Sequence, residues 1–159
     1  MEKIASFTVN HLDLLPGLYV SRRDKVGGET VTTFDMRVTR PNTEPVMDTA
    51  ALHAIEHLGA TFLRNDPDWK DKTIYFGPRG CRTGFYIIFT GELEPLDILD
   101  CVKAMCDFIL AYEGTIPGAS PRDCGNYLLH DLPMARYEAR KYLVEVLECI
   151  TPENLHYPM

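Results

Sequence analysis

The sequence predicts an α+β fold in which a mostly antiparallel β-sheet is faced by about three helices. Two patterns carry this prediction. Short segments with alternating apolar and polar residues follow one another with short links, which is typical of antiparallel strands. Longer segments carry apolar residues at helical spacing, and one of them starts at a proline, a residue favoured in the first turn of a helix.

Five segments are expected to be extended. The clearest is residues 31–40, where Phe34, Met36 and Val38 alternate with polar residues, so that one face of the strand is apolar. Residues 83–90 carry apolar side chains on both faces, which indicates a central position in the sheet. The complete set comprises residues 4–11, 18–23, 31–40, 73–76 and 83–90.

Three helices are expected from apolar spacing. The first covers residues 48–65, with Asp48 or Thr49 as its N-cap, the second begins at Pro95, and the third covers residues 133–148. The buried side of the second helix is predicted to include Leu96, Leu99, Val102, Cys106, Ile109 and Leu110, with Cys101 outside it. The buried side of the third is predicted to include Ala135, Ala139, Tyr142, Leu143, Val146 and Leu147, and Cys149 is expected to close that helix as a structural residue.

Length and composition limit the possible classes of protein. The chain has 159 residues, of which 45% are hydrophobic, so one domain over residues 1–159 with a substantial core is expected. The net charge of −7 argues against a nucleic-acid or anionic-membrane partner. No segment has the apolar length of a membrane span or of a signal peptide core, so we expect a cytoplasmic location. The five cysteines are widely spaced and odd in number, which argues against a disulfide framework.

The first predicted helix carries the clearest chemical signal. His53 and His57 are four residues apart, and with Glu56 and Arg64 they fall within about 100° on one face. Histidines at this spacing can bind one metal ion, and a carboxylate beside them can transfer protons. The opposite face is apolar and suited to a core; it comprises Leu52, Ile55, Gly59, Phe62 and Leu63.

Two further positions remain open from the residues alone. Asp35 and Arg37 share the polar face of the strand at residues 31–40, either as a solvated pair or as functional groups. A catalytic metal usually has a third protein ligand, for which the candidates are Cys81, Cys124, His130 or an acidic side chain. A thiolate ligand would suit Fe(II), Co(II) or Zn(II).

Two other functions are compatible with the histidine helix. The His-x-x-Glu-His pattern is also that of inverted zinc metallopeptidases, in which Glu56 would activate water. A non-catalytic metal-binding module would need the two histidines but not Cys81. A peptide-cleavage assay tests the first alternative, and the Cys81→Ala variant tests the second, because loss of function in that variant would exclude a module that does not need Cys81.

Separated motifs in this chain match one family in the same order. They are Ser6-Phe7 with His11, Phe34-Asp35-Met36-Arg37 with Pro41-Asn42, His53-Ala-Ile-Glu-His57-Leu58, Gly80-Cys81-Arg82-Thr83-Gly84-Phe85-Tyr86, and Ile116-Pro117-Gly118 followed by Cys124-Gly125. From residue 5 to about residue 148 the sequence resembles the S-ribosylhomocysteine lyases, which produce autoinducer-2. One departure is Arg79, where that family usually has a methionine.

The resemblance implies a complete site. His53, His57 and Cys124 would bind one divalent metal ion, with Fe(II) as the first choice and Zn or Co as substitutes, and water would be the fourth ligand. Glu56 and Cys81 would transfer protons. The ribose hydroxyls would be held by Ser6, His11 and Arg37, and the homocysteine end by Arg64.

The resemblance also implies the reaction and the assembly. The substrate would be S-ribosylhomocysteine, cleaved by carbonyl migration and β-elimination to homocysteine and 4,5-dihydroxy-2,3-pentanedione. Each proton is taken from a carbon next to a carbonyl, which a Lewis-acidic metal makes easier. The fold would be of the LuxS/MPP-like metallohydrolase type, in a homodimer with active sites at the subunit interface.

Overall fold

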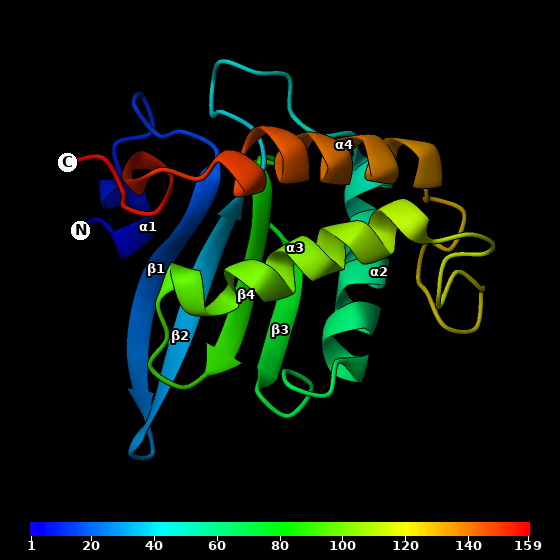
Figure 1. Cartoon of the computed structure of the whole chain (residues 1–159), viewed down its shortest axis with the longest axis horizontal. Helices are drawn as coiled ribbons and strands as arrows, with labels where there is room; N and C mark the ends of the chain where they lie inside the picture. The colour runs from blue at the N-terminus through cyan, green and yellow to red at the C-terminus, as the bar shows by residue number, and fades with distance from the viewer.

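A four-stranded antiparallel sheet in the order β1-β2-β4-β3 is the central element of the computed structural model, which describes residues 1–159 (Figure 1). The strand β4 lies between β2 and β3, which confirms the central position predicted from its two apolar faces. The strands are β1 at Gly17–Val26, β2 at Glu29–Arg37, β3 at Thr73–Pro78 and β4 at Gly84–Thr90. The α+β class is therefore confirmed.

Three long helices, α2, α3 and α4, pack on the same face of this sheet and enclose the core (Figure 1). Their bounds are Thr49–Asn65, Pro95–Ala111 and Leu132–Glu145. The core contains 27 buried residues, and Phe34 and Met36 of β2 contribute to it, as the alternation predicted. The short helix α1 at Ala5–Thr8 and the 3₁₀ turns η1 at Leu147–Cys149 and η2 at Pro152–Asn154 complete the structure.

Local chemistry determines where the long helices begin. The Asp48 carboxylate accepts a hydrogen bond from the Ala50 backbone N–H at 2.9 Å, which caps α2 as predicted. Asp131 caps α4 in the same way, through the Met134 N–H at 3.0 Å. At Gly59 an added Cβ would overlap the ring of Phe76 on β3, so glycine allows α2 to lie close against the sheet.

The opposite face of the sheet is covered at one end by the C-terminal tail, residues 152–159. The Tyr157 ring stacks on Tyr19 of β1 with centroids 4.8 Å apart, and its hydroxyl donates to Asp35. Asp35 and Arg37 are 0% and 1% exposed. A solvated strand face is therefore wrong for this pair, because the tail excludes water from it.

Other expectations also need correction. Residues 4–11 are not a strand, because α1 forms there instead and the segment pairs with no other strand. In α3 the buried side is rotated toward Cys101, which is buried, whereas Leu96 is 63% exposed. Cys149 is exposed and does not pack in the core. All six residues predicted for the buried side of the third helix are buried, but α4 ends at Glu145, so Val146 and Leu147 lie beyond it and the predicted end at residue 148 is wrong.

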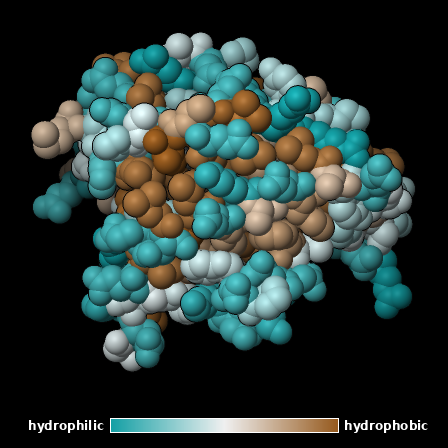
Figure 2. Space-filling model, viewed as in Figure 1, coloured by the Kyte–Doolittle hydropathy of each residue, from teal (hydrophilic) through white to brown (hydrophobic).

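The surface around the helices is mostly hydrophilic. Apolar side chains remain visible in the seam between α3 and α4, with hydrophilic groups around them (Figure 2). None of the helices combines the length and hydrophobicity that are needed to cross a membrane.

Candidate metal centre and adjoining cleft

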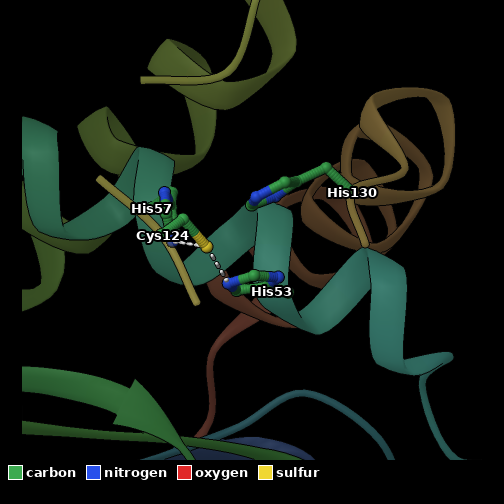
Figure 3. A group of neighbouring side chains, drawn as sticks. All are labelled: His53, His57, Cys124 and His130. Atoms are coloured by element: carbon green, nitrogen blue, oxygen red, sulfur yellow. Dashed lines mark hydrogen bonds between the residues drawn. The ribbon is translucent and has the colours of Figure 1, made fainter. Parts of the chain in front are cut away.

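Four side chains converge beside α2: His53, His57, Cys124 and His130, whose ligand atoms all lie within 4.8 Å of one another (Figure 3). The two first histidines come from one face of α2, as their spacing predicted. Cys124 and His130 come from the long loop between α3 and α4, which returns to lie against this helix. Segments about 70 residues apart in the sequence thus build one cluster.

The orientation of both α2 histidines is fixed by backbone carbonyls. Nδ1 of His53 lies 2.7 Å from the Leu129 oxygen, and Nδ1 of His57 lies 2.7 Å from the Pro117 oxygen. A carbonyl oxygen can only accept, so Nδ1 carries the proton in each ring and donates it. The Nε2 atoms are therefore left with free lone pairs facing the cluster, which is the arrangement that metal-binding histidines adopt.

The Cys124 sulfur lies where a shared ion requires it. Its Sγ is 3.5 Å from Nε2 of His53 and 3.9 Å from Nε2 of His57 (Figure 3). A nitrogen and a sulfur bound to one tetrahedral zinc at ordinary bond lengths lie about 3.5 Å apart. The Asn126 backbone N–H donates to Sγ at 3.4 Å, which helps to hold the sulfur in this position. The donor set thus fits a divalent ion that accepts nitrogen and sulfur.

His130 is the fourth member of the cluster. From the sequence alone it is only one of several candidates for the third metal ligand. Its ring stacks on that of His53 with centroids 4.0 Å apart. Both ring nitrogens are buried and have no hydrogen-bond partner in the protein. Burial, together with the repulsion that His53 and His57 exert when they are protonated, lowers the pKa of His130 to about 4, so the ring is neutral at pH 7. Unpaired nitrogens at this place indicate that the cluster is completed by a bound group.

A cleft of about 350 Å³ adjoins the cluster. His53 and Glu56 of α2 lie on one side, and the loop that follows β3 lies on the other. Its lining is Thr49, Leu52, His53, Glu56, Pro78, Arg79, Gly80, Arg82 and Leu129. A somewhat larger cavity of about 390 Å³ lies between the N-terminal loop and the C-terminal tail, but it contains none of the four clustered residues. The chemistry therefore points to the cleft beside Glu56.

Cys81 is an exposed residue between two lining residues of this cleft, and its thiol is activated. Its Sγ lies 3.1 Å from Oγ1 of Thr83 and 3.8 Å from Nη1 of Arg37. Partial burial, which would raise the pKa of Cys81, is outweighed by the Thr83 hydrogen bonds and by the charges of Arg37 and Arg79, so the pKa of the thiol lies below its usual value.

Arg79, the departure from the family pattern, thus acts on the Cys81 thiol. Its guanidinium also lies over the Tyr86 ring at 4.2 Å, with Nη1 3.4 Å from Oδ2 of Asp35. A methionine could make neither the ion pair nor the charge contribution.

The four residues predicted to bind substrate, Ser6, His11, Arg37 and Arg64, do not line the cleft. Arg37 is 1% exposed and contacts Cys81. Ser6 on α1 lines a separate cavity of about 280 Å³ against the outer sheet face. His11 places Nδ1 2.8 Å from the Val9 carbonyl in the N-terminal loop. Arg64 lies two helical turns beyond His57 and donates to the Ile74 carbonyl at 2.9 Å.

Comparison with known proteins agrees with the motifs. The family model described as S-Ribosylhomocysteinase (LuxS) matches residues 4–153. Proteins named S-ribosylhomocysteine lyase from Clostridium beijerinckii, Phocaeicola vulgatus and Clostridium acetobutylicum are 60%, 57% and 57% identical over 158 residues. These matches cover 99% of this chain and 98–99% of each relative, and they confirm the resemblance seen in the sequence. The chain therefore belongs to the S-ribosylhomocysteinase (LuxS) family.

Proposed function

We propose that this chain is an S-ribosylhomocysteine lyase, which releases homocysteine and leaves 4,5-dihydroxy-2,3-pentanedione, the precursor of autoinducer-2. Its close relatives carry that enzyme name, and its family is the S-ribosylhomocysteinases. The observation that carries the proposal is one cleft with a His/Cys cluster and Glu56 on one side and the loop of the activated Cys81 on the other. Family membership does not favour a peptidase or a non-catalytic metal-binding module.

In this proposal His53, His57 and Cys124 hold one divalent ion, with Fe(II) as the first choice and Zn or Co as substitutes. The ion supplies Lewis-acid polarisation of the substrate carbonyl, and no change of oxidation state is required. Support comes from the free Nε2 lone pairs and from the spacing of the cysteine sulfur. His130, neutral and stacked on His53, closes the remaining side of the cluster.

Glu56 and Cys81 would move the protons. The C–S bond can break by β-elimination only after the sugar carbonyl has moved to the carbon three bonds from sulfur, which places sulfur on the β-carbon of that carbonyl. One base takes a proton from the carbon next to the carbonyl, and a proton is returned to the neighbouring position as the carbonyl moves. In the last step a base removes the proton from the carbon between the carbonyl and the carbon that bears sulfur. The electron pair of that C–H bond forms a C=C double bond, and homocysteine leaves as a thiolate that takes up a proton. Glu56 on α2 and Cys81 on the facing loop provide bases on two sides of the cleft.

We further propose a homodimer with a fold of the LuxS/MPP-like type, in the cytoplasm. The three long helices leave the outer face of the sheet without a helical layer, and Ile74 and Tyr75 there are 43% and 45% exposed. Ser6 lies against this face and not in the cleft of its own chain. Pairing of two such faces would bring the N-terminal arm of one chain to its partner, where Ser6 and His11 could hold the ribose.

The proposed function is tested by incubating the metal-loaded protein with S-ribosylhomocysteine and titrating the free thiol. Thiol release is expected from the metal-loaded protein with the natural sequence, and none is expected from the metal-loaded Cys81→Ala variant. Incubation with an unstructured peptide serves as the comparison for the peptidase alternative. Peptide cleavage without thiol release, or full thiol release by Cys81→Ala, would contradict the proposal.

A further inference from the structure

The C-terminal tail reaches the buried polar group that supports Cys81. Tyr157 lies beyond residue 153, where the match to the family model ends. Its ring stacks on Tyr19 with an interplanar angle of 19°, and Asn154 anchors the tail by donating to the Pro16 carbonyl at 2.9 Å. The position of Tyr157 is therefore determined by contacts that do not involve Cys81.

A continuous series of polar contacts leads from this tyrosine to the thiol. The Tyr157 hydroxyl donates to Oδ2 of Asp35 at 2.8 Å, and Nη2 of Arg37 donates to the same oxygen at 2.6 Å. The other terminal nitrogen of Arg37, Nη1, donates to Oγ1 of Thr83 at 2.7 Å and lies 3.8 Å from Sγ of Cys81. One guanidinium thus connects the carboxylate that Tyr157 contacts to the thiol.

We propose that Tyr157 is a positioning residue, whose hydroxyl holds Asp35 so that Arg37 faces Cys81. The proposal rests on the proposed function only in giving Cys81 a role in proton transfer. The charged and titratable groups around this thiol are Arg37 from β2, Arg79 from the loop after β3, and Asp35 behind both, with Tyr86 beneath Arg79. Two positive charges and one negative charge leave a net positive environment, which favours the thiolate.

The hydroxyl matters because Asp35 has few donors. The Asp35 side chain is fully buried, and its Oδ1 has no hydrogen-bond partner, so Oδ2 accepts from both Tyr157 and Arg37. A buried carboxylate that loses one donor relies more strongly on the remaining ones. Without the hydroxyl, the charge of Asp35 cancels more of the charge of Arg37, and the thiolate of Cys81 is less favoured.

The test uses Tyr157→Phe, which keeps the ring on Tyr19 and removes only the hydroxyl. The rate of alkylation by iodoacetamide is measured at each cysteine by peptide mass spectrometry between pH 5 and 10, on the metal-loaded full chain. Exposed Cys149 is the internal reference. The matched control is Tyr137→Phe, since Tyr137 on α4 is 59% exposed and takes part in none of the tail contacts.

In Tyr157→Phe we expect alkylation of Cys81 at pH 7 to slow by about two- to threefold, which corresponds to a rise in its apparent pKa of about 0.3–0.5. Alkylation of Cys149, metal content and the Tyr137→Phe profile should not change. An unchanged Cys81 profile in Tyr157→Phe, or an equal change at Cys149, would overturn the proposal. The alkylation result is independent of turnover: if Cys81→Ala still releases thiol, the role of Cys81 in the proposed reaction fails, whereas the positioning of its thiol is still measured.

Discussion

Replacing Asp35 by asparagine should strongly destabilise the protein. Its carboxylate lies 2.6 Å from the guanidinium of Arg37, and both side chains are at most 1% exposed. At an effective dielectric constant of about 20, unit charges at this distance attract by about 6 kcal/mol. Removing one partner leaves the other charge buried and uncompensated, which typically costs about 3–5 kcal/mol. We therefore expect the free energy of unfolding to fall by about 3 kcal/mol or more in Asp35→Asn.

An exposed ion pair in the same sheet provides the control. Asp24 lies 2.8 Å from Arg22 on β1, but these side chains are 42% and 64% exposed. Surface pairs of this kind contribute about 0–1 kcal/mol, so Asp24→Asn should change stability by no more than that. The assay is urea unfolding at fixed protein and metal concentrations, compared by the midpoint and the slope.

A double variant separates the charge effect from loss of packing. Arg37→Met alone leaves Asp35 unpaired, whereas Asp35→Asn with Arg37→Met removes both charges. The double variant should lose less free energy of unfolding than the two single variants lose together, because it contains no unpaired buried charge. Additive costs, or a loss below about 1 kcal/mol in Asp35→Asn, would refute the view that burial makes this pair important.

Three further predictions concern the candidate site. Cys124→Ala should lose the metal ion and thiol release together while remaining folded, and full occupancy by elemental analysis would contradict its role as a ligand. Glu56→Gln should keep the metal but reduce turnover by about 10²–10⁴-fold, because the amide cannot accept a proton; near-normal turnover would exclude it as a base. His57→Ala chains refolded together with chains carrying both Ser6→Ala and His11→Ala should regain part of the activity that each parent lacks. Mixed dimers that stay inactive would show that the N-terminal arm serves its own chain.

Sequence patterns were sufficient for the features that depend on neighbouring residues. The limits of α2 follow from an N-cap at Asp48 and from continuous apolar spacing. The shared face of His53 and His57 follows from helix geometry alone. The central position of β4 follows from its two apolar faces. The same kind of pattern was misleading at residues 4–11, where Ala5–Thr8 form one helical turn and the segment pairs with no strand.

Only the tertiary structure decided which distant residues meet. His130 has no local signal that distinguishes it from other histidines, and it joins His53 because the loop between α3 and α4 returns to α2. Asp35 and Arg37 share a strand face in any strand, but whether that face is wet or dry depends on a tail about 120 residues away, where Tyr157 lies. Residue spacing determines the direction of a side chain within its own element, whereas its burial and partners depend on chain segments that local periodicity does not describe.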